Sequence, residues 1–396
     1  MIKDFIWWLT KENIVVNIIY RNYIYLLFPK KEDFKLEGVA LTSKDELVSN
    51  NTKSLKRNLL SIKGYTSGTT NKPMTVYRSL KSILLEEYII KSLLKQVGVS
   101  VRPRIAIIRG DKINHATKNS GPFWKEMKFT KRLILSSYHI SESNAQAYFD
   151  ELTRYKPEVI FAYPSSITLL AKYALKLDWK PNWEVKAVIT SSETFKLQDQ
   201  VLAKKVFCNI FDHYGQAERV AVLQQCIHGN YHVRDDYSKV EFIADEHGLS
   251  IIGSNYHNKA MPLKRYNTKD YVIGLHQDAS CLCGNRADYV EQVLGRDDDF
   301  VILSDGRQIG RLDVVFKEVK GLVECQVEQV SLTEIIIRLV PTLDCNIDTL
   351  KQTLHDNLEE RLGVGFNFNY QIVNEVPRTK AGKFRSVIRN KELKVA

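Results

Sequence analysis

Short apolar runs alternate with amphipathic segments through the middle of the chain. Segments 165–175 and 197–207 have helical spacing, and each follows an apolar run that predicts a strand. The predicted strands are residues 104–108, 158–162, 185–190 and 209–212. Strands that alternate with helices are typical of a largely parallel, covered sheet. We therefore predict an α/β fold, with a large multi-layer N-terminal domain built on mostly parallel sheets.

The pattern changes twice further along the chain. Closely spaced strands, including 240–243 and 249–252, predict an antiparallel appendage. A polar stretch at 295–299 precedes a different kind of sequence, which predicts a small α+β C-terminal module. Its predicted elements are strands at 322–330, 334–340 and 366–373 and a helix at 347–362. The predicted domains are a large domain over 1–295, a hinge at 296–299 and a small mobile domain over 300–396.

The composition narrows the class of protein without naming a function. With 396 residues, 44% of them hydrophobic and 26% charged, the chain has an ordinary globular profile and room for two domains. Its net charge of +11 comes from scattered basic residues. No helix-turn-helix, RNA-recognition or paired Cys/His finger pattern accompanies them. We therefore expect no nucleic-acid partner.

The N-terminal apolar stretch is interrupted by Lys11, Glu12 and Arg21. These charges break any membrane span, and the stretch has no secretory-signal pattern. We expect residues 14–28 to form a helix packed on the large domain. The alternative is an interfacial anchor, which would give peripheral membrane association. The expected location is cytoplasmic.

A hydroxyl-rich stretch, residues 65–73, has the composition of a phosphate-binding loop. Hydroxyls and backbone N–H groups supply short donors for a triphosphate, glycine permits close approach, and lysine adds charge. The residues concerned are Thr66, Ser67, Gly68, Thr69, Thr70 and Lys72. Because the second glycine of the Gly-x-x-x-x-Gly-Lys-Ser/Thr loop is absent, a Ser/Thr-rich surface turn explains this stretch equally well when it is taken alone.

Further motifs follow this loop in a fixed order. They are Ser191-Ser192-Glu193, Tyr214-Gly215-Gln216-Ala217-Glu218, Arg265-Tyr266-Asn267-Thr268-Lys269-Asp270, Gly295-Arg296-Asp297-Asp298 and Pro377-Arg378-Thr379-Lys380-Ala381-Gly382-Lys383. Each is weak alone, since such turns are usually structural. In this order and spacing, however, residues 60–385 resemble the adenylate-forming superfamily of acyl-CoA synthetases, firefly luciferases and peptide-synthetase adenylation domains.

Within that superfamily, the chain resembles the phenylacetate–coenzyme A ligase family, and in particular its branch in capsular polysaccharide biosynthesis. The branch is indicated by the short N-terminus, by Cys281-Leu282-Cys283-Gly284 and by Gln326-Val327-Glu328-Gln329.

The resemblance implies a two-step reaction that uses ATP and Mg²⁺. A small carboxylic acid and MgATP first give acyl-AMP and pyrophosphate, and a nucleophile then displaces AMP. The implied acceptor is a thiol such as coenzyme A. Two alternatives stay open: transfer to an amine or hydroxyl of a sugar, amino acid or carrier in polysaccharide biosynthesis, and a nucleotide-binding protein without turnover.

The resemblance also assigns roles to residues of the large domain. Tyr214 would stack near adenine, Glu218 would ligate Mg²⁺, and Asp270 would accept hydrogen bonds from the ribose hydroxyls. The family has glycine where this chain has Lys269, which puts the tightness of that turn in question.

Other implied roles lie at the two ends of the motif series. Residues 66–72 would hold the β- and γ-phosphates, although Asn71 stands where the family usually has glycine. Arg296 would reach the ribose or a phosphate, and Asp298 occupies the hinge position about which the small domain rotates between half-reactions. Lys383 matches the catalytic lysine, whose cation offsets negative charge as the carboxylate attacks the α-phosphorus.

Four residues predict a metal site. Cys226, His232, Cys281 and Cys283 offer three thiolates and one imidazole, a set that fits a closed, structural zinc site. His228 is also near in sequence, and the resemblance favours His232. The alternative is a group of small buried thiols.

The acid-binding pocket is expected around 136–139, Tyr163, 191–193 and His213. These residues leave the identity of the acid open.

Overall fold

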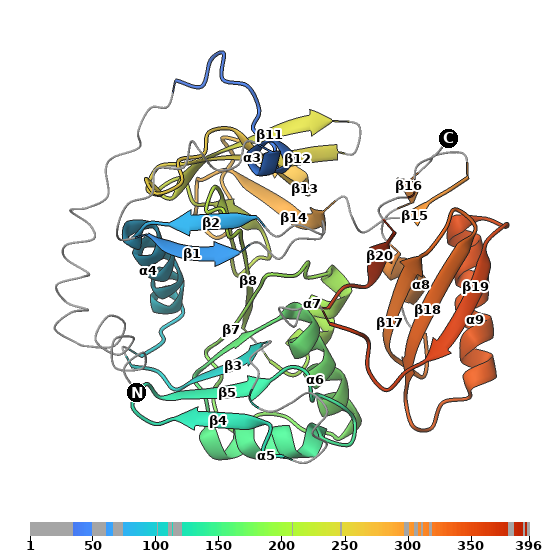
Figure 1. Ribbon diagram of the computed structural model, residues 1–396. Helices are drawn as coiled ribbons and strands as arrows, with labels where there is room; N and C mark the ends of the chain where they lie inside the picture. The colour runs from blue at the N-terminus through green and yellow to red at the C-terminus, as the bar shows by residue number, and fades with distance from the viewer. Residues whose placement is uncertain are drawn as a thin grey trace. The chain divides into compact units, whose positions relative to one another are not determined.

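In the computed structural model, the described residues form two compact units (Figure 1). Unit 1 ends at Leu294 and unit 2 begins at Gly295. The described residues are 35–49, 61–65, 74–100, 102–109, 113, 121–207, 209–245, 248–296, 301–304, 308–309, 312–316, 319–378, 384–390 and 393. The segment 14–28 and the predicted phosphate loop therefore lie outside them.

One large sheet forms the frame of unit 1. Twelve of the described strands join in the order β11-β12-β13-β14-β10-β9-β8-β7-β6-β3-β5-β4. Neighbours from β8 to β5 are parallel, and β4 closes that edge antiparallel to β5. The bounds here are β3 Ile105–Arg109, β4 Trp124–Met127, β5 Arg132–Ser136, β6 Val159–Ala162, β7 Ala187–Ser191 and β8 Ile210–Gly215. The predicted α/β class and its parallel strands are confirmed.

The predicted antiparallel strands are confirmed, but they continue the large sheet and do not form an appendage to it. Strand β8 continues beyond the predicted 209–212 to Gly215, and its last residues pair with β9, His213 opposite Gln224. This ladder joins the parallel and antiparallel parts. The bounds are β9 Val222–Gln225, β10 Tyr231–Val233, β11 Ser238–Asp245, β12 Gly248–Asn255, β13 Tyr266–His276 and β14 Tyr289–Arg296.

Helices of unit 1 pack on the parallel strands. Leu93 and Leu94 of helix α4 lie in one cluster with Ile189 and Phe211, which marks one face of the sheet. Pro164 begins α6, where a missing N–H costs no helical bond. The bounds are α4 Leu80–Gln96, α5 Ala145–Tyr155, α6 Pro164–Lys176 and α7 Leu197–Lys204. Among the helices that the structure describes, none has the length and apolar character to cross a membrane.

A β-hairpin flanks the predicted phosphate loop. Strand β1, Ile62–Tyr65, pairs antiparallel with β2, Thr75–Arg78, and Tyr65 lies opposite Thr75. Residues 66–74 therefore join two adjacent strand ends. Val76 packs in one cluster with Val220 and Tyr266, which brings the hairpin beside the Tyr214–Glu218 and Arg265–Asp270 motifs. The short helix α3, Lys44–Ser49, precedes the hairpin.

Unit 2 is an α+β unit with its own core. Its main sheet has the order β19-β18-β17-β20, and leucines of α9, such as Leu354 and Leu358, pack on Val327 and Ile337. The bounds are β15 Val301–Ile302, β16 Gln308–Ile309, α8 Asp313–Phe316, β17 Leu322–Gln329, β18 Glu334–Pro341, α9 Ile347–Leu362, β19 Asn367–Ile372 and β20 Val387–Arg389. Strands β17, β18 and β19 and helix α9 match the predicted strands and helix, whereas β15, β16, α8 and the later strand β20 were not predicted.

Candidate active site

Glu218 is a buried carboxylate between β8 and β9. Its side chain is 3% exposed and accepts a hydrogen bond of 3.0 Å from the Tyr266 hydroxyl, at the start of β13. The next residue, Arg219, has a left-handed backbone with φ of 61° and reaches α4, where it pairs with Glu86. A left-handed backbone is unfavourable for arginine and persists only where its surroundings enforce it. Glu218 is therefore held at a fixed place.

Tyr214 and Asp270 meet, although 56 positions separate them in the sequence. The Tyr214 hydroxyl donates to Asp270 Oδ2 at 2.6 Å, and the Gln216 amide donates to the same hydroxyl at 2.9 Å. Burial, and then the neighbouring Asp270 carboxylate, raise the pKa of Tyr214 well above its usual range. The tyrosine therefore stays protonated and orients the carboxylate.

The turn before Asp270 resolves the question that Lys269 raised. Lys269 adopts φ of 56°, the left-handed conformation that favours glycine. Its backbone N–H donates to Asn267 Oδ1 at 2.8 Å, and the Asp270 N–H donates to Thr268 Oγ1 at 3.1 Å. These side-chain bonds stabilise the turn without glycine.

Other predicted residues are not placed. Residues 66–73, Asp298 and Lys383 lie outside the described residues, and only the backbone of Arg296 is described, as the last residue of β14.

Polar side chains gather where the parallel strands of unit 1 end. Arg109 lies opposite Ser136 in the β3–β5 ladder, and Ser191 lies opposite His213 in the β7–β8 ladder. The Arg109 Nη2 donates to Ser191 Oγ at 3.0 Å, so these side chains share one face of the sheet. Ligands of open α/β sheets bind outside the carboxyl ends of the strands. The expected acid-pocket residues Ser136, Ser191 and His213 lie at this edge.

Sequence reasoning missed Arg109. Arg109 directly follows the predicted strand 104–108. A charged residue at the carboxyl end of a parallel strand could have been predicted as a ligand-binding residue from that position.

His213 is a buried titratable group at this edge. Burial, and then the positive charges of Arg109 and Arg234, lower its pKa to about 4, so the ring is neutral near pH 7. Its Nδ1 lies 3.5 Å from the Gln224 amide nitrogen. Its Nε2 has no hydrogen-bond partner among the described residues, and neither does the buried Ser137 hydroxyl.

The predicted metal ligands are brought together. The ligand atoms of Cys226, His232, Cys281 and Cys283 all lie within 4.8 Å of one another. Cys226 Sγ is 3.9 Å from Cys281 Sγ, and Cys283 Sγ is 3.3 Å from His232 Nε2. Tetrahedral zinc with bonds of about 2.3 Å to sulfur separates two thiolates by about 3.8 Å. The cluster therefore has nearly the spacing of a closed zinc site.

Two similar turns present the cysteines. The Gly229 N–H donates to the Cys226 carbonyl, and the Gly284 N–H donates to the Cys281 carbonyl, each at 2.9 Å. Both glycines have positive φ, 89° and 81°. His232 Nδ1 faces the Ala287 carbonyl at 3.3 Å, which leaves Nε2 for a ligand.

The thiol of Cys281 lies in a setting that favours the thiolate. Burial alone raises its pKa, but the Cys283 backbone N–H and the Asn230 amide outweigh burial and lower it to about 6. Thiolates are the form that binds zinc.

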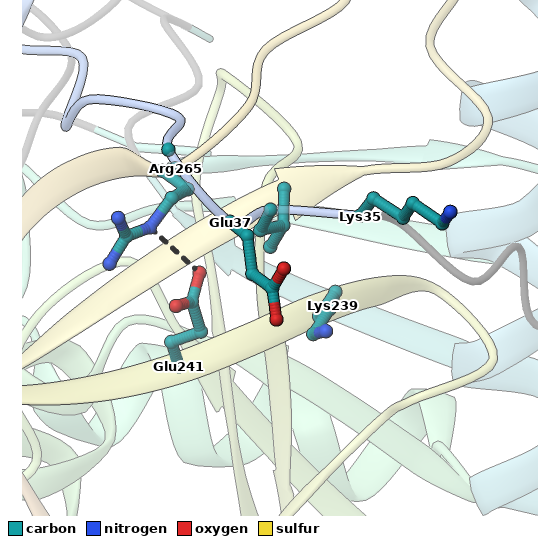
Figure 2. A pocket seen from close by; sticks show the side chains of 7 residues that line it. Lys35, Glu37, Lys239, Glu241 and Arg265 are labelled. Atoms are coloured by element: carbon teal, nitrogen blue, oxygen red, sulfur yellow. Dashed lines mark hydrogen bonds and ion pairs between the residues drawn. The ribbon is translucent and has the colours of Figure 1, made fainter.

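A separate open groove of about 590 Å³ lies on the antiparallel part of unit 1 (Figure 2). Arg265 donates to Glu241 across it at 3.3 Å. Its lining residues are Lys35, Leu36, Glu37, Gly38, Lys239, Glu241 and Arg265. Acidic and basic groups alternate there, and it contains none of the predicted site residues.

Solved ligases share this fold. The chain is similar to 2-hydroxyisobutyryl-CoA ligase in the postadenylation state in complex with R3-HIB-AMP, with a TM-score of 0.67 and 14% identity over 94% of this chain and 85% of that one. For an anthranilate CoA ligase in complex with anthranoyl-AMP, the TM-score is 0.50 and the identity 15%, over 81% and 65%. The protein therefore has the adenylate-forming ligase fold, as the motif order predicted.

Two sequence comparisons point to CapK proteins. Residues 301–390 match the CapK C-terminal domain. The chain is 25% identical over 359 residues to Protein CapK of Staphylococcus aureus, which covers 88% of this chain and 79% of that protein. The chain is thus similar in sequence to CapK and shares the adenylate-forming ligase fold, in agreement with the predicted resemblance.

Proposed function

We propose that this protein activates a carboxylic acid with ATP as an acyl-adenylate and then transfers the acyl group to a thiol such as coenzyme A. In the first step a carboxylate oxygen bonds to the α-phosphorus, the α–β phosphoanhydride bond breaks, and pyrophosphate leaves. The observation that carries the proposal is the Tyr214–Asp270 hydrogen bond, which joins two motif residues that would bind one nucleotide.

The nucleotide roles follow from this pair. Asp270, oriented by Tyr214, would accept hydrogen bonds from the ribose hydroxyls, and the Tyr214 ring would lie near adenine. Residues 66–72 would hold the β- and γ-phosphates, because hydroxyls and N–H groups suit phosphate oxygens. Arg296 would add a cation near the ribose or a phosphate.

Glu218 fits a magnesium ligand. It supplies the hard carboxylate oxygen that Mg²⁺ prefers, and Tyr266 fixes its orientation. Bound there, Mg²⁺ supplies positive charge that offsets the charge developing on pyrophosphate. Lys383 would supply a second cation, at the α-phosphate.

We also propose that Cys226, His232, Cys281 and Cys283 hold a structural zinc ion. Their spacing and the His232–Ala287 contact support this assignment. All four positions would be filled by protein ligands, which leaves none open for catalysis.

The proposal has two versions, which differ in the group that accepts the acyl chain. In the first version the acceptor is a thiol. The sequence resemblance to the capsular polysaccharide branch leaves one alternative open, transfer to an amine or hydroxyl of a sugar, amino acid or carrier. In either version, the small domain would rotate about Asp298 so that Lys383 serves the first step and the acceptor reaches the intermediate in the second.

Acid-dependent exchange of labelled pyrophosphate into ATP tests the first step. A panel of carboxylic acids is assayed with MgATP, with reactions lacking acid as controls. Exchange above control with at least one acid is expected, and coenzyme A should then increase AMP release. Binding of MgATP without exchange across the panel would instead indicate a nucleotide-binding protein without turnover.

A further inference from the structure

We propose that the acid activated by this protein carries a second negatively charged group, which Arg109 and His213 bind at the carboxyl edge of the parallel strands. This inference rests on the adenylating activity proposed above. It adds the substrate class, a short dicarboxylate, which the nucleotide residues leave open.

Arg109 is held in place at this edge. It ends β3, and its Nη2 donates to Ser191 Oγ at 3.0 Å. Its guanidinium carbon lies 5.8 Å from the centre of the Phe161 ring and 6.0 Å from that of Tyr163. Aromatic rings at such distances attract a cation, so the charge is positioned before a ligand arrives.

His213 adds a donor on the same face. Since the Gln224 amide nitrogen can only donate, Nδ1 is the acceptor and Nε2 carries the proton of the neutral ring. This buried Nε2–H has no partner among the described residues. A side chain at Gly215 would bring its Cβ to 3.5 Å from Nε2, so glycine leaves room beside the donor. A buried donor without a partner is costly and calls for an acceptor.

Two carboxylates near this edge, among the residues that the structure describes, have other hydrogen-bond partners. Ser192 adopts φ of 77°, and Glu193 beyond it accepts from the Ser165 N–H, at the start of α6, at 2.9 Å. Asp212, next to His213 in β8 and so on the opposite face, accepts from Thr190 at 2.5 Å. The edge therefore presents a cation and a neutral donor, which match an anionic oxygen rather than a hydrocarbon chain.

The test compares acids of equal length in the pyrophosphate-exchange assay. Succinate is paired with butyrate and glutarate with pentanoate, and 4-hydroxybutyrate separates charge from hydrogen bonding. Arg109→Met keeps the length of the side chain and removes its charge. Arg132→Met is the matched control, since Arg132 begins the parallel strand β5 and lies about 13 Å along it from the carboxyl edge.

Wild-type protein is expected to prefer each dicarboxylate over its partner acid. Arg109→Met should lower that preference on the order of 10²-fold in kcat/KM, while Arg132→Met keeps it. Equal use of the paired acids, equal use of 4-hydroxybutyrate and succinate, or a loss in Arg109→Met that is uniform across all acids would overturn the inference and leave the adenylating activity standing. No exchange with any acid would reject both.

Discussion

Glu324 holds one end of the segment that carries Lys383. This residue of β17 forms an ion pair with Arg378 at 2.5 Å, and their side chains are only 10% and 12% exposed. The Arg378 guanidinium also lies 4.8 Å from the centre of the Phe384 ring. Arg378 comes directly before residues 379–383 and Phe384 directly after them. The ion pair thus ties both flanks of this segment to one strand.

Two further contacts from β17 hold the residues that follow Phe384. The Gln326 amide donates to the Arg385 carbonyl at 2.9 Å, and the Val327 N–H donates to the Ser386 carbonyl at 2.8 Å. Arg385 and Ser386 therefore stay bonded to β17 when Arg378 loses its partner.

Glu324→Gln removes the charge that compensates the partly buried Arg378. Removing one partner of a fully buried ion pair costs about 3–5 kcal/mol; because this pair is only partly buried and the variant keeps an amide oxygen, we expect a cost at or below the lower bound. Because a displacement of about 1 Å of a catalytic group can cost 10²-fold in rate, acyl-AMP formation should fall by at least roughly 10-fold. Transfer from preformed acyl-AMP, a step in which the proposed mechanism gives Lys383 no role, should change less.

Glu328→Gln is the matched control. Glu328 lies on the same strand and also forms a 2.5 Å ion pair, but with Arg338 of β18. Single-turnover assays would follow both half-reactions, and thermal denaturation would give the folded fraction of each variant. If the two variants lower acyl-AMP formation equally per folded molecule, Glu324 does not position the lysine.

Three further predictions address the other proposed sites. Glu218→Gln should weaken the Mg²⁺ dependence and slow acyl-AMP formation, and a wild-type magnesium titration in the variant would count against metal ligation. Chelation or Cys281→Ser should lower the thermal midpoint more than the activity per folded molecule, and less than about half an equivalent of zinc in the purified protein would reject the site. Asp298→Pro should preserve acyl-AMP formation and impair transfer, because proline restricts φ; equal loss in both steps, or in neither, would show that Asp298 is not the hinge.

The sequence by itself determined the elements that depend on local pattern. Helix α9 spans the predicted residues 347–362, because its leucines recur at helical spacing and Asn346 caps its first turn by accepting from the Thr349 N–H. Motif order likewise indicated the superfamily and nominated Glu218, Tyr214 and Asp270. The cysteines and histidines of the sequence also predicted the metal cluster, and the family resemblance selected His232 over His228.

Only the tertiary structure decided which distant residues meet. No local pattern joins Tyr214 to Asp270, and the antiparallel strands enter the large sheet because β9 pairs with the end of β8. In the sequence, Arg109 is one charged residue after an apolar strand. Its place beside Ser191 and His213 depends on the registers of successive parallel strands. Those registers are set when the faces of the sheet are buried against helices. This packing depends on many segments at once, so no single segment predicts it.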